Sequence, residues 1–263
     1  MVSFRDQLQA GGLLVGTWVK TPHPHVVEVL ALSALDCLVL DAEHAPFDRT
    51  SLDLCILAAR AGGIGAGGKT VLVRPQSASH EHILNALDCG ADGVILPHIR
   101  TAAEAQAAVT ACHYVSGAKG YGRGYAGSSR AASYTTKSMA QHRSDAKSVI
   151  VIAQIEDVEG VNNIDAITRV EGIDALFIGR ADLTIAYDAD TPDDAVVVAA
   201  TDRIVAAGKA AGRTTGMFLG RVDDVGMWRE KGASLFILQS DQDFLLSGAA
   251  RLVGAVRASH PAT

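Results

Sequence analysis

Short apolar runs alternate with longer segments of helical period along most of the chain. Each run is rich in Val, Ile or Leu and is apolar at nearly every position, which is typical of a parallel strand covered on both faces. The predicted strands cover residues 13–20, 37–43, 70–75, 93–98, 149–156, 174–182, 214–219 and 234–240.

The segments between these strands are rich in alanine and carry apolar residues at helical spacing. Ser79 and Thr101 are suitable N-caps, and Gly62, Gly90 and Gly232 are suitable C-terminal stops. The predicted helices lie near residues 24–34, 51–61, 79–88, 101–114, 160–170, 194–211, 222–231 and 242–258.

Eight strand-then-helix units favour an α/β fold, a (β/α)₈ TIM barrel formed by residues 1–263 as a single domain. A doubly wound open sheet is the alternative, but the Gly-rich first turn of nucleotide-binding sheets is missing. Residues 115–147 form the longest stretch without periodicity. A connection of that length predicts a segment that folds over the barrel or between subunits.

Composition narrows the class of protein. The chain is 48% hydrophobic and 20% charged, which excludes a disordered chain. It has no apolar stretch of about 18 residues and no secretory h-region, so we expect neither a membrane span nor secretion. The net charge of −6 without a basic stripe argues against a nucleic-acid partner. Four cysteines without CxxC spacing indicate reduced thiols in a cytoplasmic protein; they are Cys37, Cys55, Cys89 and Cys112.

Two carboxylates end neighbouring predicted strands. In such a barrel the reactive groups lie at the carboxyl ends of the strands, and Glu156 and Asp182 occupy these positions on the fifth and sixth strands. Neighbouring strands are about 4.8 Å apart, so both side chains can converge on one hard cation such as Mg²⁺ or Mn²⁺. The alternative is a helix cap and a salt bridge.

Three other strand-end residues suggest acid–base and anion chemistry. Asp41 and His44 lie three residues apart, so the carboxylate can orient the imidazole for proton transfer. The alternative is a surface histidine in a loop. Arg74 follows an apolar run, and its guanidinium suits a carboxylate or enolate oxygen; a salt bridge to Glu43 is the alternative.

The other histidines follow no shared metal-ligand spacing, and the Gly-rich segment 120–125 is best explained as a flexible loop. These histidines are His23, His25, His80, His82, His98, His113, His142 and His260.

Several short motifs, taken together, resemble the HpcH/HpaI aldolase family of metal-dependent class II pyruvate aldolases. The resemblance extends from about Gly16 to Leu252. The motifs that carry it are LDAEHAP, VRP, AQIE and FIGRADLT, supported by GTW, ADGVILPHI, KGYGR and GMFL.

The resemblance implies reversible aldol cleavage of a 4-hydroxy-2-oxoacid to an aldehyde and pyruvate, or a close 2-oxoacid such as hydroxypyruvate, through a metal-stabilised enolate. It implies a homohexamer, a trimer of dimers in which the last helix is exchanged between barrels. It also implies a divalent ion, Mg²⁺, Mn²⁺ or Co²⁺, that binds pyruvate.

The resemblance also assigns residues. It places the ion on Glu156 and Asp182 and the 2-oxo oxygen beside Arg74, and it pairs His44 with Asp41 for acid–base work. The remaining implied substrate contacts are Gln154 beside the metal and the main-chain amides from Gly179 through Ala181 to Asp182.

Three positions depart from the family pattern. Arg180 stands where many members have proline, and residues 119–122 replace the usual RGxG. Phe218, with Trp18 as a second apolar wall, is expected to narrow the aldehyde site and to favour small or neutral aldehydes. Arg123 is the counter-indication, because it could receive a distal carboxylate if its loop reaches a neighbouring subunit.

Three other functions remain open. A lysine-dependent class I aldolase would need Lys20, the lysine predicted nearest to a strand end. A citrate lyase or malyl-CoA lyase would need room for an acyl-CoA. An inactive barrel that binds a metal–oxoacid complex would show no turnover.

Overall fold

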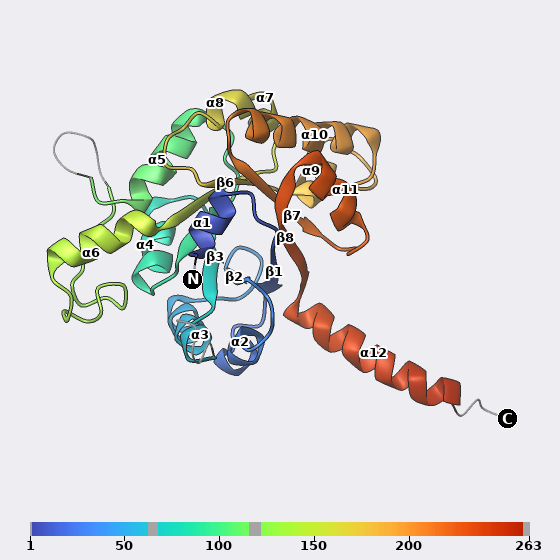
Figure 1. The fold of residues 1–263 in the computed structure, drawn as a ribbon, viewed down its shortest axis with the longest axis horizontal. Helices are drawn as coiled ribbons and strands as arrows, with labels where there is room; N and C mark the ends of the chain where they lie inside the picture. Colours follow the sequence, from blue (N-terminus) through green and yellow to red (C-terminus); the bar gives the residue numbers. More distant parts are fainter. Residues whose placement is uncertain (1, 63–67, 116–121, 260–263) are drawn as a thin grey trace.

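The computed structural model describes residues 2–62, 68–115 and 122–259, and its centre is a closed barrel of eight parallel strands (Figure 1). Each strand pairs with the next in chain order, and the last pairs with the first. The strands are β1 (Leu14–Val19), β2 (Cys37–Asp41), β3 (Thr70–Arg74), β4 (Gly93–Leu96), β5 (Ile150–Ile155), β6 (Ala175–Ile178), β7 (Thr214–Leu219) and β8 (Ala233–Ser240). The predicted (β/α)₈ barrel is confirmed.

Helices follow the strands and surround the barrel (Figure 1). They are α1 (Phe4–Gln9), α2 (Pro24–Ala31), α3 (Arg49–Gly62), α4 (His80–Asp88), α5 (Ala102–Cys112), α6 (Met139–Asp145), the 3₁₀ turn η1 (Ala146–Ser148), α7 (Val158–Asn162), α8 (Ile164–Ile167), α9 (Arg180–Ala186), α10 (Ala195–Ala210), α11 (Asp224–Lys231) and α12 (Asp241–Ser259). Four of these elements, α1, α6, η1 and α9, are not predicted from the sequence, and the predicted helix at 160–170 is divided into α7 and α8.

The sixth predicted strand is too long. β6 ends at Ile178, and α9 begins two residues later. Arg180, Leu183 and Thr184 are buried on one face at helical spacing, so this segment buries its apolar side chains as a helix. Asp182 therefore lies in the first turn of a helix rather than at a strand end.

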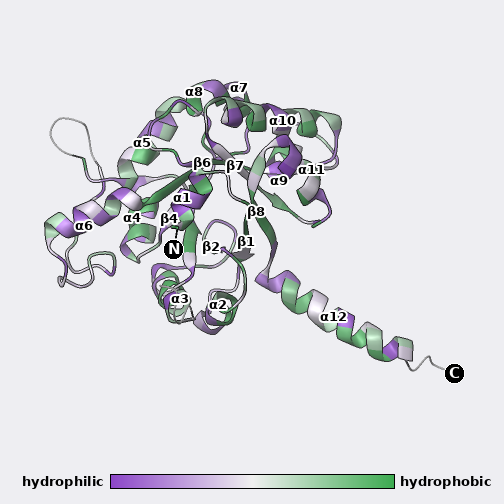
Figure 2. Ribbon diagram, in the orientation of Figure 1, coloured by the Kyte–Doolittle hydropathy of each residue, from purple (hydrophilic) through white to green (hydrophobic). Residues whose placement is uncertain are grey.

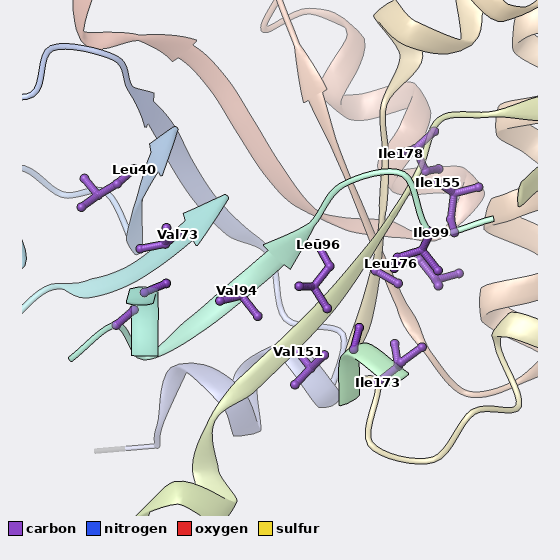
Figure 3. Packing of buried hydrophobic residues seen from close by; sticks show 14 of the residues in the cluster. Leu40, Val73, Val94, Leu96, Ile99, Val151, Ile155, Ile173, Leu176 and Ile178 are labelled. Carbon is purple, nitrogen blue, oxygen red and sulfur yellow. The ribbon is translucent and has the colours of Figure 1, made fainter. Parts of the chain in front are cut away.

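Alternate side chains on each strand point to opposite sides of the barrel wall. On β2, Leu38 and Leu40 belong to an outer apolar layer between strands and helices, whereas Cys37 and Val39 belong to an inner one. Figure 3 shows part of the outer layer, in which side chains from β2 to β6 pack together. The four cysteines are free and buried, consistent with the predicted reduced thiols.

The inner layer fills the barrel, and α1 covers its amino end. Leu8 of α1 is fully buried against the inner layer. Arg5 donates to Asp174, just before β6, at 2.9 Å, and the hydroxyl of Thr214, at the start of β7, donates to the carbonyl of Leu8. The side chains available for chemistry are therefore at the opposite, carboxyl end.

The last helix, α12, leaves the barrel after β8 and extends away from it (Figure 1). Among its described residues only Asp241 is buried. Figure 2 shows apolar residues distributed along its length. Its exposed large apolar side chains are Leu245, Leu246, Leu252, Val253 and Val256. Within the described ranges, no helix is long and apolar enough to cross a membrane.

Candidate active site

Near the carboxyl ends of the strands, the side chains that point into the barrel change from apolar to polar. Asp41 lies two residues after Val39, and Arg74 lies two residues after Leu72, so both continue the inward face of their strands. Gln154 stands in the same relation to the inward Ile152 on β5. The strand period therefore directs these polar side chains over the filled barrel.

Asp41 and Arg74 form a buried ion pair between register partners on β2 and β3. Arg74 Nε donates to Asp41 Oδ1 at 3.0 Å, and Arg74 Nη2 lies 2.8 Å from Oδ2. Lys20 Nζ lies 3.3 Å from the same Oδ2. Burial by itself raises the pKa of Asp41, but Arg74, the main-chain N–H of His44 and Lys20 together hold it below its ordinary value. Asp41 is therefore a fixed anion.

Arg74 is held from two further directions. Its guanidinium carbon lies 4.2 Å from the ring centroid of Trp18, and its Nε lies 3.2 Å from Glu43 Oε2. The salt bridge to Glu43 considered from the sequence is thus present together with the Asp41 pair. Trp18, predicted as a wall of the aldehyde site, is buried beneath Arg74 and meets Phe177 edge to face at 5.8 Å.

His44 contacts Asp41 through its main chain. Its N–H donates to Asp41 Oδ1 at 3.2 Å, whereas its imidazole is 52% exposed and has Nε2 at 3.6 Å from Glu43 Oε2. Asp41 thus fixes the loop that carries His44 rather than contacting the ring. The acid–base role of the two residues stays a prediction.

Glu156 follows β5 and is 2% exposed. Its Oε1 accepts the main-chain N–H of His98 at 2.8 Å, and its Oε2 accepts Gln154 Nε2. Burial, with a contribution from the charge of Asp182, raises the pKa of Glu156 to about 7, although Gln154 and His98 act in the opposite direction. A Cβ atom at Gly179 would lie 2.5 Å from Glu156 Oε2, so only glycine allows this approach.

Asp182 faces the same carboxylates from α9. Its charge raises the pKa of both Glu43 and Glu156. The group of possible ligand atoms that converge within 4.8 Å contains Glu156 but not Asp182, so the pairing of Glu156 with Asp182 on one cation stays a prediction. The N–H of Gly179 donates to the Ile155 carbonyl at 3.1 Å, and Ala181 is exposed on α9. The assignment of these amides to a substrate carboxylate stays a prediction.

Sequence reasoning gave no metal role to Glu43 or His98. One oxygen or nitrogen atom from each of Glu43, His98 and Glu156 lies within 4.8 Å of the others. His98 follows β4, the neighbour of the strand that precedes Glu156. The role of His98 could have been predicted from the order of strands around the barrel, because that order brings together ligands whose spacing along the chain is irregular.

The donors at this site suit a divalent cation. Gln154 Oε1 is buried and has no hydrogen-bond partner among the described residues. The described cluster has five carboxylates, those of Asp41, Glu43, Glu156, Asp157 and Asp182, and three basic side chains, Arg74, Lys20 and His98. Carboxylate and amide oxygens with one imidazole are ligands for Mg²⁺, Mn²⁺ and related ions. A bound cation would offset the excess negative charge.

The remaining predicted positions lie at the margins of the site. Phe218 is partly buried against the inner layer at the end of β7. Arg180 is buried, donates to the Pro192 carbonyl and to Asp193, and stacks on Trp228 at 5.1 Å. Residues 119–121 lie outside the described ranges.

Arg123 does not extend toward a neighbouring site. Its guanidinium is buried and pairs with Asp88 on α4 at 3.1 Å. The segment that carries it contains α6 and packs on its own barrel, since the N–H of Ala131 donates to the carbonyl of Asp88.

A closed (β/α)₈ barrel with carboxylates, an arginine and histidines at the carboxyl ends of its strands defines a barrel enzyme with its active site at that end. The chain belongs to the HpcH/HpaI aldolase/citrate lyase family, whose model matches residues 14–247. It is similar to a hydroxypyruvate/pyruvate aldolase of Pseudomonas aeruginosa, with 30% identity over 98% of this chain and 94% of that protein.

Two further comparisons agree. A 5-keto-4-deoxy-D-glucarate aldolase of Escherichia fergusonii is 33% identical over 97% of this chain and 96% of that protein. The crystal structure of an HpcH/HpaI aldolase/citrate lyase family protein from Burkholderia cenocepacia J2315 has a TM-score of 0.91 at 30% identity, covering 98% of this chain and 100% of that one. The protein is a carbon–carbon lyase of the aldolase type.

Proposed function

We propose that the protein catalyses reversible aldol cleavage of a 4-hydroxy-2-oxoacid to an aldehyde and pyruvate, or a close 2-oxoacid such as hydroxypyruvate, with Mg²⁺ or Mn²⁺. The observation that carries the proposal is the excess of carboxylates over basic side chains around the buried, unpartnered Gln154 Oε1. The hydroxypyruvate/pyruvate aldolase among the relatives supports the choice of 2-oxoacid.

Glu156 and Asp182 would hold the cation, with Gln154 fixing the Glu156 carboxylate. When bound, a divalent cation acts as a Lewis acid toward the oxygens of the 2-oxoacid. Glu156 is well suited to this role because its main-chain and side-chain donors come from neighbouring strand ends and restrict its orientation.

Arg74 would bind the 2-oxo oxygen. Asp41 and the face of Trp18 hold its guanidinium in place before substrate arrives. A fixed positive group stabilises charge that develops in the transition state without reorganising, which is the usual source of such catalysis. Asp41 therefore acts as a positioning residue for Arg74 as well as for the His44 loop.

His44 would transfer the proton. In cleavage its imidazole takes the proton of the 4-hydroxyl, the C3–C4 bond breaks, the aldehyde carbonyl forms and the electron pair passes to the 2-oxoacid fragment. A proton from solvent then adds at C3 to complete pyruvate, and the His44 imidazolium releases its proton to solvent. The half-exposed ring next to Glu43 lies at the barrel mouth, where the distal part of the substrate must reach.

The assembly we propose is a homohexamer, a trimer of dimers in which α12 packs on a neighbouring barrel. The exposed leucines and valines of α12 support this, because a helix with large apolar side chains gains stability when a second surface covers it. Asp241, which accepts the N–H groups of Lys20 and Thr21, anchors the start of this helix to its own barrel. The four buried free thiols support a cytoplasmic location.

Chelation tests the proposal. Protein treated with EDTA should lose cleavage of a 4-hydroxy-2-oxoacid and regain it with Mn²⁺, Mg²⁺ or Co²⁺, with lactate dehydrogenase reporting the pyruvate formed. Borohydride with pyruvate should leave the protein mass unchanged, because Lys20 is engaged in an ion pair with Asp41. Full activity after chelation, or reductive trapping lost in Lys20→Arg, would replace the metal mechanism with a Schiff base. Turnover of an acyl-CoA substrate instead would indicate the lyase alternative.

A further inference from the structure

His98 has no role in the proposed reaction, yet it is aimed at the metal site. It follows β4 with a left-handed backbone, φ 53°, and its N–H donates to Glu156 Oε1. Its Nδ1 lies 3.0 Å from Asp157 Oδ2, and its Nε2 lies 3.6 Å from Glu43 Oε1. Both ring nitrogens therefore face carboxylates.

The contact with Asp157 determines how the ring can act. A carboxylate only accepts hydrogen bonds, so Nδ1 carries the proton in that contact. In the neutral ring the lone pair is then on Nε2, on the side that faces Glu43. Histidines that bind metals commonly have this arrangement, in which one nitrogen donates to a carboxylate and the other binds the ion.

The distance between Nε2 and Glu43 Oε1 fits two ligands of one ion. At 3.6 Å it is too long for a hydrogen bond. Neighbouring ligand atoms of one divalent ion, each about 2.1 Å from it, would lie about 3.0–3.4 Å apart, so a shift of a few tenths of an ångström would let both atoms bind the same ion. Without an ion or a second ring proton between them, the two lone pairs repel. The buried, unpartnered Gln154 Oε1, on the side chain that donates to Glu156, is an independent oxygen donor that suits a cation here.

We infer that His98 Nε2 is a protein ligand of the cation, with Glu43 and Glu156 as oxygen donors beside it. The inference rests on the proposed function and deepens it by assigning selectivity. Imidazole suits transition ions, whereas Mg²⁺ prefers oxygen ligands only. The site should therefore favour Mn²⁺, Co²⁺ or Zn²⁺ over Mg²⁺. Asp157 acts as a positioning residue for the ring.

Pulsed EPR of Mn²⁺-loaded protein tests the ligation directly. The wild type should show coupling of Mn²⁺ to a ¹⁴N nucleus, and His98→Asn should abolish it. His25→Asn is the matched control, since His25 is an exposed histidine on α2 and its replacement should leave the coupling unchanged. Mn²⁺ bound without ¹⁴N coupling in the wild type would show that His98 is an imidazolium paired with carboxylates, and would overturn the inference.

Metal competition against a fluorescent chelator tests the selectivity. His98→Asn should weaken Co²⁺ binding by about 10- to 100-fold and Mg²⁺ binding much less, and Asp157→Asn should shift the ratio in the same direction. An unchanged Co²⁺/Mg²⁺ ratio in His98→Asn would also overturn the inference. These failures differ from failure of the proposed function: if His98 is not a ligand, cations still bind and Glu156→Gln still abolishes that binding. If the wild type binds no cation, both are wrong.

Discussion

Two buried aspartate–arginine pairs in this barrel look alike and differ in what surrounds them. Asp41 and Arg74 pair at the strand ends, and Asp88 and Arg123 pair between α4 and the segment that follows residue 121. In both pairs the carboxylate and the guanidinium are almost entirely buried. Burial of an ion pair therefore does not by itself distinguish an active site from a structural contact.

The pair at Arg123 is balanced in charge and enclosed by rings. Arg123 lies over Tyr114, whose hydroxyl is 2.7 Å from His142 Nε2, and Tyr125 packs edge to face against both rings. His142 Nδ1 lies 3.2 Å from the carbonyl of Ala131. One cation meets one anion here, and the neighbouring rings hydrogen-bond to each other or to main chain, so the cluster ties its segment to the barrel.

The pair at Arg74 lies within an excess of negative charge. Among the described residues, four carboxylates join the pair, while only two basic groups, Lys20 and the imidazole of His98, are added; the carboxylates are those of Glu43, Glu156, Asp157 and Asp182. Such an imbalance is costly in a buried cluster unless a cation or substrate completes it. The comparison teaches that uncompensated charge, rather than buried charge, marks the reactive end of this barrel.

The largest contrast is expected between two histidines. His44→Ala should lower kcat by about 10²- to 10⁴-fold, the usual loss when a general base is removed. Binding of pyruvate, followed by calorimetry, should persist because His44 is not a proposed ligand. His142→Ala is the matched variant in the other cluster and should lower Tm with little change in kcat. Near-normal turnover of His44→Ala would make His44 a loop histidine only.

Removing the arginine of the Asp88–Arg123 pair should lower the stability of the protein. Arg123→Met leaves Asp88 buried without a partner, so we expect the free energy of unfolding to fall by about 3–5 kcal/mol. Denaturant titration measures this loss, and kcat of the folded fraction should stay near the wild-type value. A large loss of kcat at full folding would instead connect Arg123 with the active site.

Removing the arginine of the Asp41–Arg74 pair should lower the activity of the enzyme. Arg74→Met should lower kcat by about 10²- to 10³-fold, as when one fixed donor to a developing oxyanion is lost. Lys20 remains beside Asp41, so the loss of stability should be smaller than in Arg123→Met. Steady-state kinetics with denaturation curves on both variants gives the full comparison. If Arg74→Met unfolds the protein and leaves kcat unchanged, the two pairs have the same role.

Aldehyde choice should respond to Phe218 at the end of β7. Phe218→Val replaces a large ring with a smaller side chain. We expect the preference for glycolaldehyde over succinic semialdehyde, measured as the ratio of their kcat/KM values, to change in favour of the larger aldehyde by a factor equivalent to about 1–3 kcal/mol. The wild type should prefer glycolaldehyde. A wild type that favours the semialdehyde tenfold, or a ratio that Phe218→Val leaves unchanged, would contradict this assignment.

The smallest effect should be the pH dependence that His142 contributes. Burial, together with the charge of Arg123, holds the pKa of His142 below its ordinary value. As the pH falls through about 6.5, His142 therefore takes up a proton in the unfolded chain before it does so in the folded protein. The stability that His142 contributes at neutral pH is lost as a result. His142→Phe should show a shallower loss of stability between about pH 7 and 5. An equal slope in both proteins would mean that other groups dominate.

Hydrophobic periodicity was sufficient to predict the eight strands because each one is buried on both faces. It did not reveal α1 or α6, whose sequences, FRDQLQ and MAQHRSD, are short and mostly polar. It also extended the sixth strand through Asp182, because the apolar run ends at Ile178 and no N-cap side chain or proline at Gly179–Asp182 marks the change of the backbone from strand to helix.

Hydrophobic periodicity also explains which residues of the candidate site could be predicted from the sequence. Glu156, Arg74 and Asp41 directly follow or end apolar runs, so their location at the strand ends could be inferred from the chain alone. His98 and Glu43 become neighbours of Glu156 only after the barrel closes. The orientation of His44 depends on a main-chain hydrogen bond that the identities of the residues do not specify.

Apolar side chains fill the interior of the described barrel, and α1 covers its amino end. In the proposed reaction, substrates and products would therefore enter and leave at the carboxyl end, with the 2-oxoacid against Arg74 and the aldehyde near Phe218. These proposed positions predict a binding order: in synthesis the 2-oxoacid would bind first, and in cleavage the aldehyde would leave first. On this proposal, the side chains that close the amino end of the barrel would determine the kinetic order without contacting a substrate.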